Sequence, residues 1–300
     1  IVVALVVLGA RHLLLPQVDT YRTQIEAAVG EALEREVRID GIHADWSGLH
    51  PHLALRGVTL LDEAGQPALR LELVDAALGF SSLVRGRMHL HRLDINGPAL
   101  QVRRDTAGVL HVAGLALRQD GTRGGFLPWL LAQGQINIRD AELEWHDETR
   151  AGAPPLKLTQ VNLRLDNSGD RHRFGLLATP PAELARQLEL RGDVELPDID
   201  QPAGASGELY VSLDNADLAI WQRWVDYPVD LPQGRGAVRA WANFDGATLN
   251  AVTGEVALSD VKLRLLPDLP QLDLVSLSGR ISAEHLSRTR VSATARQLQL

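Results

Sequence analysis

The sequence predicts a mainly β chain of mostly antiparallel strands that share one apolar face. The first observation is a repeated phrase of eight residues. Its first, third, sixth and eighth residues are apolar and the other four are not, as in residues 136–143 (INIRDAEL). Strict copies of this phrase recur at 37–44, 88–95, 156–163 and 211–218, whereas chance would give about one copy. The second observation is the lack of a β-α-β alternation, which argues against a nucleotide-binding parallel sheet.

The phrase predicts strands that bend at a common place. Alternation with a period of two puts successive side chains on opposite faces of a strand. In residues 136–143 the alternation slips by one position at Arg139 and Asp140. Such a slip turns the later side chains to the wrong face unless the strand contains a bulge. Looser copies of the phrase at 53–60, 71–78 and 256–263 have the same spacing, so we expect a sheet that is creased along one line.

Composition narrows the class of function. The chain has 300 residues, a net charge of −8, no cysteine and only 4% aromatic residues. The negative charge disfavours a nucleic-acid partner, and the missing cysteines exclude disulfides, thiolate metal sites and cysteine nucleophiles. Because the chain begins at Ile1 and ends in a strand-like run, we expect it to be a fragment of a longer protein.

The N-terminal segment predicts a membrane anchor followed by a second helix. Residues 1–16 are almost entirely apolar, and we interpret them as a truncated transmembrane helix; a signal-peptide core and a buried helix are the alternatives. Residues 17–35 predict an amphipathic helix, with an apolar stripe that includes Ile25, Val29 and Leu33. It either lies on the membrane or plugs one end of the sheet. Its mixed charges favour the plug.

The rest of the chain predicts about 14 strands with few helices. Residues 36–200 form the first part of the sheet and 201–300 its continuation, with the boundary at the proline- and glycine-rich segment 197–207. Short helical segments are predicted at 126–132 and 218–224. We expect Trp221 and Trp224 to pack as a cap on the sheet.

Few residues suggest chemistry. His50 with His52, and His89 with His91, are pairs that could share a strand face and hold zinc, but they lack a fixed third ligand. Glu142 and Glu144 could serve a glycan hydrolase, but acids in alternation with apolar residues are also ordinary on a one-sided strand. No catalytic or nucleotide-binding motif occurs, so we expect no catalytic residue, metal site or cofactor.

The apolar face itself allows two interpretations. It can be the dry core of a closed sandwich or barrel, or the inner surface of an open, curved sheet that holds an apolar ligand. The common crease and the aliphatic composition of the face favour the open sheet.

Three places in the sequence resemble the AsmA-like envelope proteins, and most of all their YhdP branch. The first is the N-terminal apolar segment and helix, followed by VRI at 37–39 and HADW at 43–46. The second is the Gly-Pro turn and Arg-Asp-x-x-Gly hairpin within 93–108. The third is GELY at 207–210 with Trp221, Trp224, Gly234 and Trp241. These places span nearly the whole chain, although none of them is a catalytic motif.

The resemblance implies an elongated, taco-like hydrophobic β-groove with an N-terminal membrane helix and short capping helices. Such a protein would be a single-pass protein of the bacterial inner membrane, with most of the chain in the periplasm, and would conduct phospholipids toward the outer membrane. Outer-membrane or periplasmic proteins would be further partners. The alternative is a structural scaffold or regulator of the outer membrane with a closed, dry core. For the groove we predict a lining formed by Leu53, Leu55, Leu90, Leu93, Ile136, Ile138, Leu143, Leu156, Leu158, Val161 and Leu163.

Overall fold

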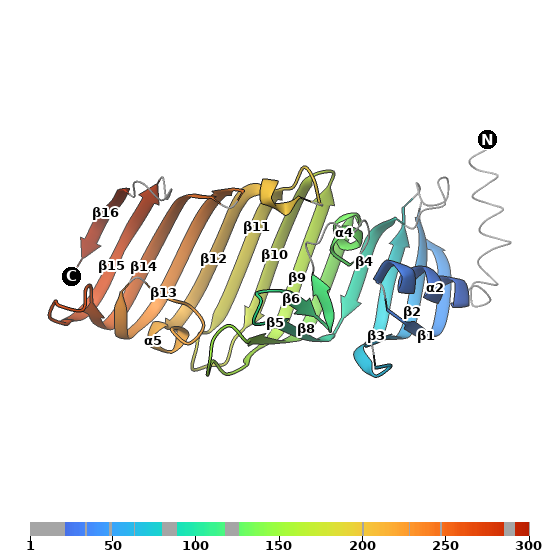
Figure 1. Ribbon diagram of the computed structural model, residues 1–300, viewed down its shortest axis with the longest axis horizontal. Helices are drawn as coiled ribbons and strands as arrows, with labels where there is room; N and C mark the ends of the chain where they lie inside the picture. The colour runs from blue at the N-terminus through green and yellow to red at the C-terminus, as the bar shows by residue number, and fades with distance from the viewer. Residues whose placement is uncertain are drawn as a thin grey trace.

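The protein forms one long, open β-sheet (Figure 1). The computed structural model describes residues 22–33, 35–47, 50–62, 64–79, 89–117, 126–199, 201–227, 229–246, 248–284 and 292–299. The neighbouring strands follow the order β1-β2-β3-β4-β8-β9-β10-β11-β12-β13-β14-β15-β16. All but two of the pairings in the sheet are antiparallel. The predicted mainly β, mostly antiparallel architecture is therefore confirmed.

The elements of the N-terminal half include two helices on the same side of the sheet. Their bounds are α2 (Arg22–Leu33), β1 (Val37–Ser47), β2 (His50–Leu61), β3 (Pro67–Leu78), β4 (Leu90–Asn96), β5 (Ala99–Arg104), β6 (Leu110–Val112), β7 (Leu115–Leu117), α4 (Phe126–Leu131) and β8 (Gln135–Asp147). The predicted short helix at 126–132 corresponds to α4.

The C-terminal half is a simple meander. Its elements are β9 (Leu156–Ser168), β10 (Arg171–Thr179), β11 (Gln187–Glu195), η3 (Pro202–Gly204), β12 (Ser206–Asp217), α5 (Leu218–Trp221), β13 (Asp230–Asp245), β14 (Thr248–Arg264), β15 (Leu272–Glu284) and β16 (Ser292–Gln299). The sheet continues across the predicted boundary near residue 200, because β11 pairs with β12.

The meander is interrupted once, at β8. Both β4 and β5 run parallel to β8 and pair with successive parts of it. Between them the chain turns at Gly97, whose φ is +62° and whose N–H donates to the Arg139 carbonyl (2.9 Å). Parallel neighbours need a long crossover connection, and here the segment that contains β5, β6, β7 and α4 supplies it.

The predicted crease is present in five of the eight copies of the phrase, while Gly41, Asp75 and Arg92, at the same position in the copies at 37–44, 71–78 and 88–95, do not have a left-handed backbone. The backbone is left-handed at Gly57, Asp140, Gln160, Asn215 and Asp260, with φ between +50° and +61°. Each of these residues is the second of the two central positions in its phrase. The pairing register shifts around Asp140 in β8 and around Asn215 in β12, as expected for a bulge. The bulges keep the later apolar side chains on the same face.

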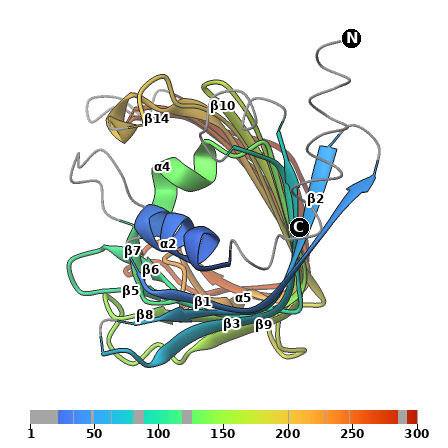
Figure 2. The ribbon, with the colours of Figure 1, turned by 90° about the vertical axis from the view of Figure 1, so that its right-hand side faces the viewer.

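The sheet curves into a trough that is open along one side (Figure 2). Both α2 and α4 lie inside the curve at the N-terminal end, where α2 packs on β1 and against α4. This position agrees with the plug interpretation of the predicted amphipathic helix at 17–35. The predicted transmembrane segment, residues 1–16, lies outside the described residues. Among the helices that are described, none is both long and apolar enough to cross a membrane.

Candidate functional site

Strand register places an unbroken row of apolar residues and one glycine across the sheet. Residues that face each other in neighbouring strands share a face, so the pairings can be followed from strand to strand. From β1 to β15 one such row, the central row, consists of Ile42, Leu55, Val74, Ile95, Ile138, Leu163, Leu176, Leu190, Val211, Ala240, Gly254 and Ile281. With strands about 4.8 Å apart, the row is roughly 50 Å long.

A second row of the same kind runs beside it. This upper row consists of Ala44, Leu53, Ala76, Leu93, Ile136, Leu165, Phe174, Gly192, Leu209, Ala242, Val252 and Ala283. Both rows face the inside of the curve, because their members in β2, β3, β4 and β8 line a cavity together with side chains of α2 and α4.

Exposure of the two rows increases along the sheet. In the first three strands Ile42, Leu53, Val74 and Ala76 are at most 9% exposed. From β10 onward the apolar side chains of the rows are half-buried or exposed, and Leu209 and Ile281 reach 41% and 47%. The concave face is therefore covered at its N-terminal end and accessible farther along.

The residues between the two rows point to the convex face and are largely polar or aromatic. The corresponding row contains His43, Ala54, Asp75, Asp94, Asn137, Arg164, Gly175, Arg191, Tyr210, Trp241, Thr253 and Ser282. Arg92 and Arg139 form ion pairs with Asp94 on this face. Burial opposes the charge of the Asp94 carboxylate, but hydrogen bonds from Arg92 and Asn137 outweigh it and hold its pKa below the ordinary value. The convex face is thus suited to water.

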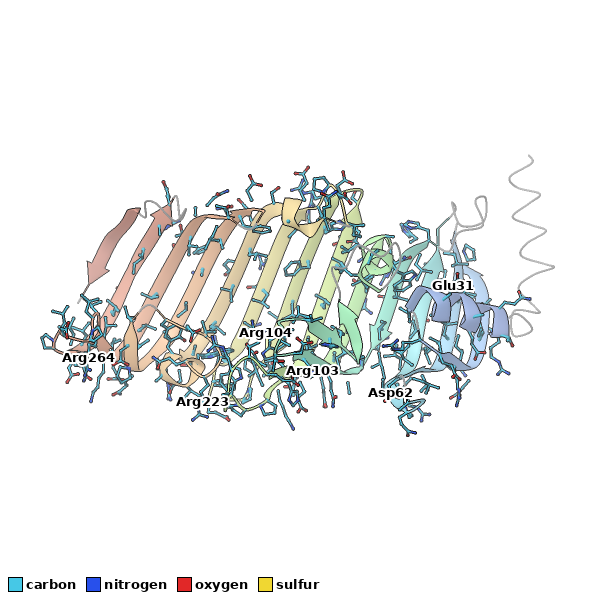
Figure 3. All side chains as sticks on the ribbon, in the orientation of Figure 1. Glu31, Asp62, Arg103, Arg104, Arg223 and Arg264 are labelled. Carbon is cyan, nitrogen blue, oxygen red and sulfur yellow. The ribbon has the colours of Figure 1, made fainter. Side chains whose placement is uncertain are left out.

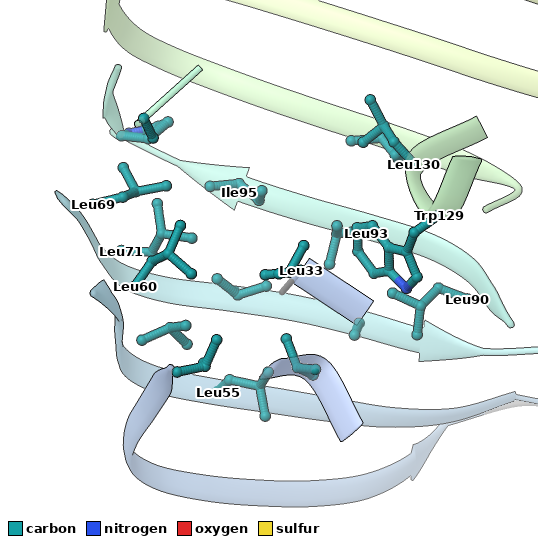
Figure 4. A pocket seen from close by; sticks show the side chains of 18 of the residues that line it. Leu33, Leu55, Leu60, Leu69, Leu71, Leu90, Leu93, Ile95, Trp129 and Leu130 are labelled. Atoms are coloured by element: carbon teal, nitrogen blue, oxygen red, sulfur yellow. The ribbon is translucent and has the colours of Figure 1, made fainter. Parts of the chain in front are cut away.

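A cavity of about 480 Å³ lies beneath the two helices at the N-terminal end (Figure 4). We call it the roofed cavity. It is bounded by Ile25, Val29 and Leu33 of α2, by Trp129 and Leu130 of α4, and by the concave side chains of β1–β5, β6 and β8. Among the described residues that line it, Glu31 is the only one with a charged side chain.

Buried hydrogen bonds fasten α4 to the sheet. The Gln133 side chain is 2% exposed. Its Oε1 accepts from the Leu90 N–H (2.8 Å) and its Nε2 donates to the Trp129 carbonyl (2.6 Å). From β9, Asn167 Nδ2 donates to the carbonyls of Leu130 and Gln133, at 3.2 and 2.8 Å. Asn167 Oδ1 in turn lies 2.8 Å from His172 Nδ1, and burial lowers the pKa of this histidine. We call this set the α4 latch.

Another set of contacts closes the lower rim of the trough, where Arg103 and Arg104 are labelled in Figure 3. Arg104 forms an ion pair with Asp147, which lowers the pKa of that carboxyl to about 2. Arg150 bonds Asp226 (3.1 Å). These contacts tie the end of β8 to β5, and the loop after β8 to the segment after α5.

The tryptophan pair of α5 and its following turn packs at the same rim. Trp221 is 6% exposed, and its Nε1 donates to the Leu184 carbonyl (2.9 Å). Trp224 Nε1 donates to the Pro154 carbonyl (3.0 Å). The two rings meet edge to face with centroids 6.0 Å apart. Both indoles therefore have structural hydrogen bonds, consistent with the predicted cap.

The predicted lining residues all lie on the concave face, in two groups. Of the eleven, six line the roofed cavity: Leu53, Leu55, Leu90, Leu93, Ile136 and Ile138. Leu143, Leu156, Leu158 and Val161 belong to or pack against a second apolar cluster around α5. Leu163 is a member of the central row between these groups. Their contact with lipid stays a prediction.

The alternative chemical sites have ordinary surroundings. Glu144 Oε1 lies 2.7 Å from His146 Nε2, and Lys157 is 3.9 Å from the same carboxylate; Glu142 is exposed. Within the described part of the chain, no group of three His, Asp or Glu side chains is arranged to hold a metal ion. The roofed cavity and the two rows are thus the features that most suggest binding.

Sequence patterns did not reveal the α4 latch. Gln133 follows a short helix, and Asn167 and His172 flank a hairpin turn, so no local pattern distinguishes them from exposed polar residues. Gln133 bonds Leu90, which lies 43 residues away in the sequence, and Asn167 bonds Gln133, which lies 34 residues away. A lone glutamine between the end of an apolar helix and the start of a strand is the one available signal, and it is weak.

Comparison with known proteins agrees with the three places of resemblance in the sequence. A search of curated proteins finds no match. The family model described as "YhdP protein" matches residues 1–294. The chain therefore belongs to the YhdP protein family, which is a family of cell-envelope proteins.

Proposed function

We propose that this chain forms part of a lipid-transfer groove that conducts phospholipids between the inner and outer membranes of the bacterial envelope. The observation that supports this most directly is the pair of apolar rows across the sheet, which are half-buried or exposed beyond β10. A large exposed apolar face on a soluble domain is uncommon and usually marks a binding surface. A polar convex face on the same strands is what a trough in water needs.

The groove would work by passive conduction. Each CH₂ group that leaves water against the rows gains about 0.8 kcal/mol, so acyl chains are held along the floor while the headgroup stays in water at the open side. Neighbouring positions along the central row are chemically alike, being Leu163, Leu176, Leu190 and Val211 in successive strands. A chain can therefore slide from one strand to the next without a large change in free energy.

The envelope location supports this function. Membership of a cell-envelope family places lipid membranes near the protein. In the proposal, residues 1–16 anchor the chain in the inner membrane and the sheet lies in the periplasm. Partners at the far end would be outer-membrane or periplasmic proteins.

The test is site-specific photocrosslinking in cells from two adjacent leucines of β10. Leu176 is a half-buried member of the central row, whereas Leu177 points to the convex face and is 40% exposed. With benzoylphenylalanine at each position in turn, we expect phospholipid adducts from position 176 and none from 177, as read by mass spectrometry. Protein adducts or no adducts at both positions would instead support a scaffold with a closed, dry core.

A further inference from the structure

The roofed cavity differs from the rest of the concave face because two helices partly enclose it. Its volume of about 480 Å³ falls within the range of small-molecule sites, roughly 300–1,000 Å³. The cavity lies between α2, α4 and the first strands (Figure 4), so a ligand in it would be covered on several sides. Along the later strands the rows offer one face only.

The wall of the roofed cavity selects for an apolar chain. Leu, Ile, Val and Ala make up most of the described lining. The backbone of the floor is already paired in the sheet. A peptide would leave its own N–H and C=O groups without partners in such a site, which costs several kcal/mol per group in an apolar medium. A hydrocarbon chain has no such groups to satisfy.

The two helices of the roof are held differently. The α4 latch uses buried side-chain hydrogen bonds, as described above. By contrast, the α2 side chains that bond to β1 are half-buried (Glu26) or exposed (Arg22). Hydrogen bonds join α2 to β1 from the Ile39 N–H to Glu26 Oε1 (2.7 Å) and from Arg22 to the Asp40 carbonyl (3.3 Å). Ile25, Val29 and Leu33 therefore cover the cavity from a helix whose hydrogen bonds to the sheet lie nearer to solvent than those of the α4 latch.

From these observations we infer that the roofed cavity is a binding site for one acyl chain of a lipid, covered by α2 and bounded by α4. This inference rests on the proposed lipid-transfer function and adds a discrete site to it. The lipid occupies the cavity at the covered end of the sheet before or after it moves along the open rows.

Tryptophan fluorescence can test this site directly, because Trp129 lines the cavity whereas Trp241 lies on the convex face beside Tyr210. The purified chain is freed of lipid in detergent, and 9,10-dibromostearate is added, with stearate as the control without bromine. We expect bromine to quench the wild-type protein and the Trp241→Phe variant alike. In the Trp129→Phe variant, bromine should quench little of the remaining fluorescence.

Two neighbouring alanines of β3 provide a second test with matched burial. Ala76 lines the cavity and is 4% exposed, whereas Ala77 is 5% exposed and is not among the lining residues. Ala76→Leu should weaken the binding of dibromostearate about tenfold, the change expected when two methylene groups of the ligand lose their burial. Ala77→Leu should leave binding unchanged. Circular dichroism of both variants checks that the fold is retained.

The outcomes separate this inference from the proposed function. If quenching persists in Trp129→Phe, or if Ala76→Leu binds as tightly as wild type, the roofed cavity is not the site and the inference is wrong. Phospholipid adducts at position 176 would still support the groove in that case. If position 176 also gives no lipid adduct, the proposed function fails as well.

Discussion

In strands β1–β8 the apolar rows lie beneath α2 and α4, whereas in strands β10–β15 the same rows lie open. Ile136 of the upper row is 2% exposed in the first region, and Leu209 of that row is 41% exposed in the second. The local sequence pattern is the same in both regions, because strict copies of the repeated phrase occur at 37–44 and at 211–218. The two regions differ in whether helices cover the rows, and not in the sequence pattern of their strands.

Strands with the same sequence pattern can therefore form either a buried core or an accessible apolar surface. Where helices cover the rows, burial of apolar area contributes to stability, at about 25 cal/mol per Å². Where the rows are open, much of that contribution is missing. The open region is stabilised instead by its backbone ladder and by the second apolar cluster around Leu218, Trp221, Leu231 and Val261, near the crease. The open rows are then free to contact a ligand.

A charge placed in each region should produce the largest contrast. Ile136→Asp leaves an uncompensated charge in a fully buried position, and we expect it to destabilise the protein by roughly 3–5 kcal/mol. Leu190→Asp lies on a half-buried position of the open rows, where water can reach the carboxylate, and should cost about 1 kcal/mol. Urea unfolding followed by circular dichroism measures both.

The same pair has a functional readout. Leu190→Asp should abolish lipid adducts at position 176 in cells while the protein stays folded, because a carboxylate on the path repels apolar chains. Leu177→Asp, on the convex face, is the control and should change neither property. Equal destabilisation by Ile136→Asp and Leu190→Asp would mean that the later strands are covered too.

Removal of the α4 latch should make the covered region resemble the open one. Gln133→Leu leaves the Leu90 N–H and the Trp129 carbonyl without their side-chain partners, and each unsatisfied buried group costs about 1–3 kcal/mol. We expect faster hydrogen exchange in α4 and β4 and a red shift of Trp129 fluorescence as the helix leaves the sheet.

A nearby glutamine offers the control for this variant. Gln135 bonds Asn137 at 3.1 Å on β8 and takes no part in the latch. Gln135→Leu should leave exchange in α4 unchanged. If Gln133→Leu had the same small effect, α4 would be held by apolar packing alone, and the distinction drawn between α4 and α2 would be wrong.

The strands and the crease could be predicted from sequence because both depend on short-range patterns of apolar and polar residues. The slip at Arg139 and Asp140 predicted a bulge, and the left-handed backbone of Asp140 confirms it (φ +51°). Asn, Asp and Gly tolerate this conformation best, and four of the five left-handed positions in the creased strands have one of these residues. Period and residue type together located most of the crease, but Gly41 and Asp75 occupy the same position in their copies of the phrase without a left-handed backbone.

Short-range patterns could not predict that α2 and α4 cover the rows, or that β4 and β5 pair in parallel with β8. Whether β8 would pair with β9 alone or also with β4 and β5 depends on contacts between residues more than 35 positions apart, such as Leu93 with Ile136. The amphipathic stripe of α2 indicated an apolar partner but not which surface would supply it. The roofed cavity exists only because those distant choices bring α2, α4 and the strands together.

The crease crosses both regions, so substitutions at its left-handed residues compare the two regions directly, with the smallest expected effects. In β2 of the covered region it uses Gly57 (φ +61°), where an added Cβ would lie 2.0 Å from Asp40 Oδ2, and in β8 it uses Asp140 (φ +51°). In the open region it uses Asn215 and Asp260, with φ of +51° and +50°. Asn215→Ala and Asp260→Ala should each cost about 1 kcal/mol, because alanine is penalised in the left-handed region by roughly that amount.

Gly57→Ala should cost more than either, since the new methyl group must also displace the Asp40 side chain. Thermal unfolding of the three variants measures the order, and Gly57→Ala combined with Asp40→Ala should recover the part that comes from the clash. If all three single variants were equally costly, Asp40 would move freely, and the crease would be equivalent in the two regions. A larger effect at Asn215 than at Gly57 would contradict the assignment of the tighter crease to the covered region.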